Sequence, residues 1–299
     1  MRCSMRMRKF EFSSPSSLAE GLKLLARHGA KAKVIAGGTD LVVQMKNKLA
    51  GPRQLISLLQ IPELAGMGKK GKKLRIGALA KHAVLENSPL LRGGWGILAT
   101  AAHKIGAPQI RNLGTVGGNL CNASPAADTA PPLLVLEAEV VLSGKRGERR
   151  VPVDSFFSGP GKTTLARGEI LKEILIPPVP AGSVWAYLKL GRRKSLDLAL
   201  TSVAVLLTLD PKTKICRRAR IALGAVSPTP LRAKGAEKFL EGKILDEGVM
   251  QEAGERAQKE CHPISDIRAS AEYRKEMIKV LVGRAIKKSL GIPIPPTGI

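Results

Sequence analysis

The first sixty residues alternate between short stretches typical of strands and longer stretches with helical spacing of apolar side chains. The expected strands lie at 8–12, 32–35 and 54–58, and the expected helices run from Leu18 to a stop at Gly29 and from Leu41 to Leu49. Ser16 and Ser17 can cap the first helix, and Thr39 and Asp40 can cap the second. The pattern predicts a small βαβαβ unit.

The middle of the chain mixes strands with short helices and ends at a proline-rich boundary, Pro177, Pro178 and Pro180. Strands are expected at 74–78, 138–143, 149–153 and 170–176, helices at 80–86 and 95–104, and a short helix completed by 133–136. Residues 107–113 are expected to be extended or irregular, because Gly106 and Pro108 end the preceding helix.

After the proline boundary the pattern changes to strands followed by helices. Strands at 184–191, 199–209 and 214–223 predict an antiparallel meander, and helices are expected at 229–241, 245–260 and 271–289. This order is typical of an α+β fold. The expected division is 1–60, 61–178 and 179–291, with a tail at 292–299.

Two glycine runs carry the candidate chemistry. Residues 34–41 read Val-Ile-Ala-Gly-Gly-Thr-Asp-Leu, and residues 114–128 read Gly-Thr-Val-Gly-Gly-Asn-Leu-Cys-Asn-Ala-Ser-Pro-Ala-Ala-Asp. Glycine lets the backbone approach a ligand closely, and a strand–turn–helix start presents N–H groups to an anion. On residue types alone, the second run could equally be a turn between strands. The two runs together suggest one elongated ligand with a diphosphate between them.

Charge and cysteine content narrow the function classes. The net charge of +25 arises from 49 Lys and Arg against 24 Asp and Glu, which suggests an anionic partner. The cations are spread along the chain and aromatic residues are only 3%, so nucleic-acid binding is disfavoured. The four cysteines are far apart, without a C-x-x-C pair or a secretion signal, so we expect a reduced, cytoplasmic protein. No apolar run approaches membrane-spanning length.

Residues 159–164, Gly-Pro-Gly-Lys-Thr-Thr, look like the end of an ATP-binding P-loop. The full pattern needs a glycine five positions before Gly161, where this chain has Phe156. A tight hairpin-like loop is therefore the better interpretation.

The two runs, their order and their surroundings resemble the FAD-binding medium subunit of molybdenum hydroxylases, the family of xanthine dehydrogenase and carbon monoxide dehydrogenase. Six local matches carry the resemblance: Lys9-Phe-Glu-Phe, Val34–Leu41, Ile105 to Leu120, Ser124–Asp128, the loop around Gly159–Thr163, and Tyr187 to Arg193 with Asp197. The resemblance implies the PCMH-type (vanillyl-alcohol oxidase-like) FAD-binding fold. In that fold, two α/β subdomains precede a C-terminal antiparallel three-stranded sheet with helices.

The resemblance also implies the FAD-contacting residues. Val34, Ile35, Ala36, Gly37, Gly38, Thr39, Asp40 and Leu41 would hold the diphosphate, chiefly through N–H groups, and Thr115, Gly117, Gly118 and Asn119 would hold its other side. Asp128 would bind the adenosine half through hydroxyls, and Ile105 and Leu171 would line apolar parts. Lys189 would approach the polar edge of the isoalloxazine. From the residues alone, Ile105 and Leu171 could be core, and a solvated strand lysine is the favoured interpretation of Lys189.

By the same resemblance, the chain would be an oxidoreductase subunit that transfers electrons. It would receive them from a small subunit with [2Fe–2S] clusters, beside a large subunit with the molybdenum cofactor, and pass them to an external acceptor such as NAD, a quinone, ferredoxin or oxygen. One family branch has an inserted cysteine loop for an extra iron–sulfur cluster, but 128–140 has no room for it, so we expect no metal site here. Cys121 is expected to be a small buried apolar residue. The alternatives are a stand-alone flavin oxidoreductase and a basic nucleic-acid-binding protein.

Overall fold

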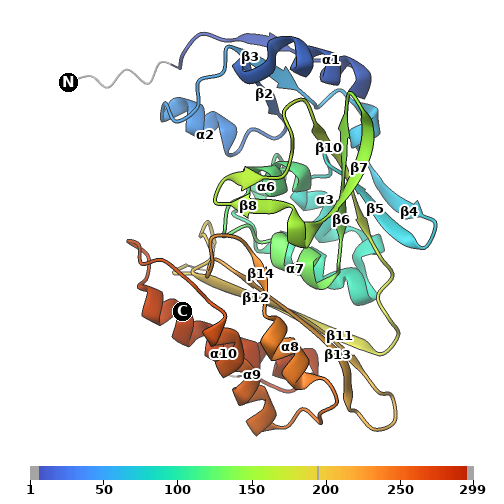
Figure 1. Ribbon diagram of the computed structural model, residues 1–299, viewed down its shortest axis with the longest axis vertical. Coiled ribbons are helices and arrows are strands. Elements are labelled where there is room, and N and C mark those ends of the chain that lie inside the picture. Colours follow the sequence, from blue (N-terminus) through green and yellow to red (C-terminus); the bar gives the residue numbers. More distant parts are fainter. Residues whose placement is uncertain (1–6, 194, 295–299) are drawn as a thin grey trace.

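The computed structural model describes residues 7–193 and 195–294, in which three larger sheets with their helices are arranged one after another along the longest axis (Figure 1) and a fourth sheet is a two-stranded hairpin. Cys3, Lys194 and the last five residues of the predicted tail lie outside the described residues. The combination of helices with one parallel and two antiparallel sheets confirms the α+β class.

The first sheet is parallel, in the order β1 (Glu11–Ser13), β3 (Gln54–Ser57), β2 (Ala32–Ile35), with helices α1 (Leu18–His28) and α2 (Leu41–Lys46). The Ser17 hydroxyl caps α1, as predicted. Two details of α2 were predicted wrongly. The helix ends before Leu49, because Lys48 adopts a left-handed conformation at φ 61°. Asp40 precedes α2 with helical backbone angles and no side-chain capping bond.

The second sheet is antiparallel, in the order β4 (Met67–Lys70), β5 (Lys73–Gly77), β10 (Ile170–Ile176), β6 (Glu139–Gly144), β7 (Gly147–Pro152). Its helices are α3 (His82–Asn87), α4 (Gly96–His103), α5 (Pro108–Arg111), α6 (Val116–Asn122) and α7 (Ala130–Val135). The short helix α5 corrects the extended segment expected at 107–113. Pro108 occupies its first position, where a fixed φ and a missing N–H are tolerated.

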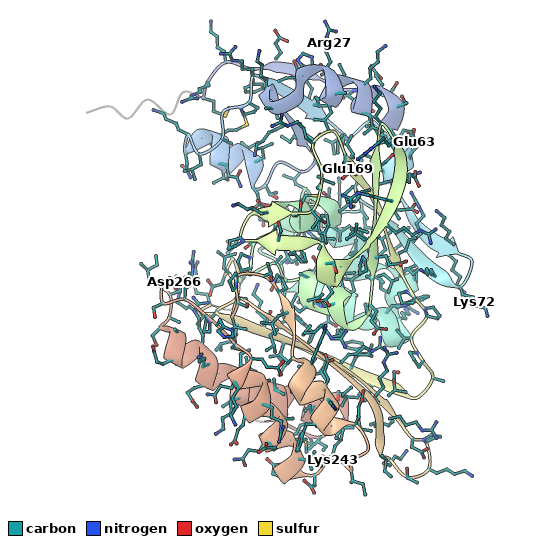
Figure 2. All side chains as sticks on the ribbon, in the orientation of Figure 1. Arg27, Glu63, Lys72, Glu169, Lys243 and Asp266 are labelled. Carbon is teal, nitrogen blue, oxygen red and sulfur yellow. The ribbon has the colours of Figure 1, made fainter. Side chains whose placement is uncertain are left out.

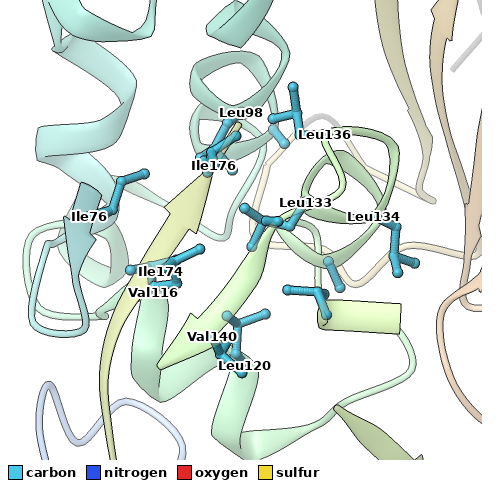
Figure 3. Close-up of a cluster of buried hydrophobic side chains, with 14 of the residues drawn as sticks. Ile76, Leu98, Val116, Leu120, Leu133, Leu134, Leu136, Val140, Ile174 and Ile176 are labelled. Atoms are coloured by element: carbon cyan, nitrogen blue, oxygen red, sulfur yellow. The ribbon is translucent and has the colours of Figure 1, made fainter. Parts of the chain in front are cut away.

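Side chains from this sheet and its helices form the main hydrophobic core (Figure 3). Ile76, Val140 and Ile174 come from three strands, and Val116 and Leu120 from α6, and all five are fully buried. Because α6 is the helix of the second glycine run, burial of its apolar side fixes that run against the sheet.

The third sheet has the order β11 (Ser183–Leu190), β12 (Thr201–Leu209), β13 (Cys216–Gly224), β14 (Leu231–Arg232). It therefore has four strands, not the predicted three, since Leu231 and Arg232 pair with β13. Helices α8 (Lys234–Leu240), α9 (Glu247–Lys259) and α10 (Ala271–Ser289) cover one face. The other face contributes Tyr187, Ala204 and Leu206 to the main core. The third sheet is thereby packed onto the part of the chain that carries the second glycine run.

The stretch that looks like a P-loop is a hairpin of β8 (Phe157–Gly159) and β9 (Lys162–Thr163), which confirms the hairpin interpretation. Short 3₁₀ turns occur at Gly29–Lys31, Pro62–Leu64, Pro89–Leu91, Gly93–Trp95 and Val153–Ser155. Among the described helices, none is long and apolar enough to cross a membrane.

Basic side chains are distributed over the whole molecule. Figure 2 shows Arg27 on α1 at one end, Lys72 in the β4–β5 turn, and Lys243 after α8 near the other end. This spread agrees with the sequence pattern, in which no segment concentrates the positive charge.

Candidate cofactor site

A cavity of about 760 Å³ lies between the first two sheets and reaches the loop that precedes β12. Its volume falls within the range of roughly 300–1,000 Å³ typical of small-molecule and cofactor pockets. The sequence-predicted site residues that line it are Val34, Ile35, Ala36, Gly37, Gly38, Thr39, Asp40, Leu41, Ile105, Thr115, Gly117, Gly118, Asn119, Asp128 and Leu171. Lys189 is not in the cavity wall.

The two glycine runs contact each other at Gly37. A Cβ atom at this position would overlap the carbonyl oxygen of Leu113 and would lie 2.9 Å from the Cα of Gly114. The next residue, Gly38, has a left-handed backbone with φ 72°, which glycine adopts without steric cost. The glycines of the first run therefore allow the turn after β2 and the segment between α5 and α6 to meet at the cavity.

The first run provides unpartnered backbone donors. Within the described chain, the N–H groups of residues 37–41 donate to no backbone or side-chain acceptor. These residues line the cavity in succession. Consecutive free N–H groups in a tight turn form a concave anion-binding surface, so this segment fits a phosphate or diphosphate.

The second run contributes differently, because its backbone donors are already used. The N–H groups of Val116 and Gly117 donate to the carbonyl oxygens of Ala80 and Ala78, both at 2.9 Å. The Gly118 N–H donates to Oγ1 of Thr115 at 3.1 Å, and the Asn119 N–H to the Thr115 carbonyl at 2.9 Å. Among the described residues, the amide nitrogens of Asn119 and Asn122 are free, since Oδ1 of Asn119 accepts from the Thr129 hydroxyl at 2.6 Å and Oδ1 of Asn122 accepts from Gln44. This run therefore offers side-chain donors and space for a ligand.

Asp128 and Lys189 form a buried ion pair at 2.7 Å, with each side chain only 8% exposed. Nζ of Lys189 also donates to the carbonyl of Lys104 at 2.9 Å, and the Tyr187 hydroxyl donates to the other carboxylate oxygen at 2.8 Å. The interpretation of Lys189 as a solvated lysine was therefore wrong. Burial raises the pKa of Asp128, although Lys189 opposes this effect, and burial raises the pKa of Tyr187 well above its usual value.

Sequence reasoning missed part of the cavity wall. His82 at the start of α3, Gln44 on α2, and the segments 165–170 and 196–198 also line it. Gln44 donates to the Asn122 amide oxygen at 3.2 Å and so joins the two glycine runs. The one available signal was Gly168, a turn residue directly before a strand. His82 and Gln44 carry no such local signature.

Cys121 also lines the cavity, and burial raises the pKa of its thiol to about 12. At neutral pH the thiol is therefore protonated and a poor nucleophile. Cys121 was expected to be a small buried apolar residue, but it is only half-buried, because it lies in the cavity wall.

The stability of the ligand-free chain is expected to fall below pH 6.5 because of His82. Burial, together with the charge of Arg111, lowers the pKa of this imidazole from 6.5 to about 4. Between these values the unfolded chain binds a proton that the folded chain does not, so stability decreases as pH decreases. The full effect is about 3 kcal/mol. In urea unfolding at pH 7 and 4.5, His82→Gln should lose about 2 kcal/mol less than the parent chain. Parallel losses in the two proteins would contradict this assignment.

Two glycine runs in contact, a row of free N–H donors and a long cavity define a binding fold for a cofactor that contains a diphosphate. Residues 8–179 match the FAD binding domain in molybdopterin dehydrogenase, and residues 186–289 match the CO dehydrogenase flavoprotein C-terminal domain. The chain belongs to the family of FAD-binding medium subunits of carbon monoxide and xanthine dehydrogenases, and its cofactor is FAD. The predicted family, cofactor and oxidoreductase class are thereby confirmed.

Relatives align over nearly their full lengths. The carbon monoxide dehydrogenase medium chain of Hydrogenophaga pseudoflava is 38% identical over 93% of this chain and 96% of its own. The putative xanthine dehydrogenase FAD-binding subunit of Escherichia coli (strain K12) is 33% identical over 94% and 97%, respectively. A solved structure of the Hydrogenophaga enzyme, which lacks the Mo-pyranopterin moiety of its molybdenum cofactor, superposes with a TM-score of 0.92. It shares 37% identity and covers 96% of this chain and 99% of that one.

Proposed function

We propose that this chain is the electron-transfer subunit of a multi-subunit molybdenum hydroxylase. Electrons would enter from the [2Fe–2S] clusters of a small partner subunit and leave for an external acceptor, with NAD as one candidate. A large partner subunit would hold the molybdenum cofactor and the substrate. The observation that carries this proposal is that the FAD cavity lies in a chain that aligns with medium subunits over almost their whole length.

The chain's own residues would bind and orient the cofactor. The N–H groups of Gly37, Gly38 and Thr39 would donate to the diphosphate, because they have no other acceptor in the described chain. Asn119 would donate through its amide, and Asp128 would accept from hydroxyls of the adenosine half while it remains paired with Lys189. Ile105 and Leu171 would supply apolar contacts. When bound, FAD supplies the redox chemistry that amino-acid side chains lack.

Lys189 would act on the cofactor indirectly, from behind the wall. Its ammonium pairs with Asp128 at 2.7 Å and donates to the Lys104 carbonyl, so its charge is balanced by the carboxylate. Lys189 would therefore hold Asp128 in position toward the cavity, and its approach to the polar edge of the isoalloxazine stays a prediction.

Removal of FAD from the native complex is expected to separate reduction of the iron–sulfur clusters by substrate from reduction of the external acceptor. In the complex purified with its molybdenum and iron, substrate should still bleach the iron–sulfur absorbance after FAD is removed. Reduction of the external acceptor should stop and should return when FAD is added. Carbon monoxide, xanthine and other candidate donors can be tried in turn, with NAD and quinones as acceptors.

Two outcomes would overturn the proposal. If the isolated chain with FAD oxidises a substrate without partner subunits, it is a stand-alone flavin oxidoreductase. If the purified protein is colourless and binds DNA with a steep salt dependence, its charge serves nucleic acid instead.

A further inference from the structure

The imidazole of His82 is a buried polar group in the cavity wall that the chain itself leaves without a partner. The side chain is 2% exposed and lines the cavity. Its backbone N–H donates to the Gly114 carbonyl at 3.1 Å, which fixes it beside the second glycine run. Across residues 7–193 and 195–294, neither ring nitrogen has a hydrogen-bond partner, and Nδ1 is completely enclosed. Buried polar atoms in native proteins rarely lack a partner, so a ligand is expected to provide one.

Burial keeps this imidazole neutral, and the charge of Arg111 adds to the effect by lowering its pKa further. Arg111 is the nearby cation, and its own partner is Glu86, at 2.6 Å. Glu86 also pairs with His103 through its other oxygen, so both carboxylate oxygens are occupied. A neutral imidazole has one N–H donor and one lone pair.

The tautomer follows from the enclosed nitrogen. An orphaned N–H is less tolerated in protein interiors than an acceptor with an unused lone pair. Nδ1 therefore carries the lone pair, and the proton lies on Nε2. Nε2 is then the nitrogen that can donate to a group entering the cavity.

The imidazole lies where the two glycine runs meet. A Cβ atom at Gly114 would be 3.2 Å from Cδ2 of His82 and 3.5 Å from the Thr39 hydroxyl, so all three groups surround one point. Thr39 belongs to the segment with the free N–H groups. We propose that Nε2–H of His82 donates a hydrogen bond to a diphosphate oxygen of FAD, which makes His82 a further cofactor-binding residue. This inference rests on FAD occupying the cavity.

The test uses the full chain freed of FAD and titrated with FAD while flavin fluorescence is followed. His82→Phe keeps a ring but removes both nitrogens, and it should weaken FAD binding by about tenfold or more, as expected for a lost hydrogen bond to a charged group. His82→Gln places an amide near the position of Nε2 and should retain affinity within about threefold of the parent chain. His82→Asn reaches only the position of Nδ1 and should behave like the Phe variant.

Titration with ADP, which has the diphosphate but no flavin, shows which part of FAD accepts the hydrogen bond from His82. His82→Phe should weaken ADP and FAD binding by the same factor. If only FAD binding weakens, the bond is to the flavin and the diphosphate assignment is wrong. His103→Gln is the matched control, since it disturbs the same Glu86 cluster outside the cavity wall and should leave both affinities unchanged.

Equal FAD affinity in the parent chain and all three His82 variants would show that His82 is only structural. Thermal unfolding of the FAD-free variants separates that case, because a structural role changes the melting temperature without producing the affinity order Gln above Asn and Phe. A parent chain that binds no FAD would instead count against the cavity as the FAD site.

Discussion

Gly37→Ala should reduce FAD affinity by about a hundredfold, the equivalent of nearly 3 kcal/mol of overpacking strain. The added methyl group would overlap the Leu113 carbonyl, which belongs to the backbone and cannot rotate away. One of the two glycine runs must then move, and the free N–H groups of residues 37–41 move with it. The measurement is FAD titration of the full chain freed of its cofactor.

Gly68→Ala is the matched control, because a Cβ at that position would meet nothing within 4 Å and its backbone is not left-handed.

Gly118→Val should also lower FAD occupancy, but for a different reason. Its Cβ would meet only the Thr115 hydroxyl, at 2.9 Å, so the larger side chain would fill ligand space without separating the runs. Full flavin content in Gly37→Ala would mean that contact between the runs is not needed for binding.

Asp128→Ala is expected to destabilise the chain by about 3–5 kcal/mol, the usual cost of leaving one partner of a buried ion pair alone. Lys189 would remain buried with only the Lys104 carbonyl, and the Tyr187 hydroxyl would lose its acceptor. Because Asp128 also lines the cavity, FAD occupancy should fall as well. Urea unfolding of the FAD-free chain and flavin content of the purified protein measure the two effects separately.

A double-mutant cycle isolates the pair. Adding Lys189→Met to Asp128→Ala should recover part of the lost stability, because the uncompensated charge is removed. Glu252→Ala, which breaks the exposed pair with Arg256, is the control and should cost less than about 1 kcal/mol. If Asp128→Ala costs no more than this control, the pair contributes little to the fold.

The local sequence was sufficient to predict which backbone segments line the cavity. It was not sufficient to predict the side-chain contacts in the cavity wall. Glycine runs and their neighbouring strands are contiguous in sequence, so the residues from Val34 to Leu41 stood out from the local pattern alone, and they line the cavity. The pairing of Asp128 with Lys189 joins positions 61 apart in the chain, and it depends on how the third sheet packs. No spacing rule reports such a contact, which is why Lys189 was expected to be solvated.

Short elements were missed because periodicity needs length. Strand β14 has two residues and helix α5 has four, so neither completes a recognisable repeat. The boundaries predicted at residues 60, 178 and 291 remain predictions. His82 shows the remaining difficulty, because nothing in the residues around it indicates that its ring nitrogens lack partners.

The composition of the cavity wall also bears on the order of chain synthesis, folding and cofactor binding. Its segments begin at Leu25 and end at Leu198, so the wall joins positions separated by more than half the chain. Contacts of such long sequence separation form slowly, after the entropy of closing large loops has been overcome. During synthesis, the ribosome must therefore release the loop before β12 before FAD can be enclosed. Capture of the cofactor in this cavity is therefore expected only after residue 198 has left the ribosome, and bound flavin is expected to mark a chain folded at least as far as that loop.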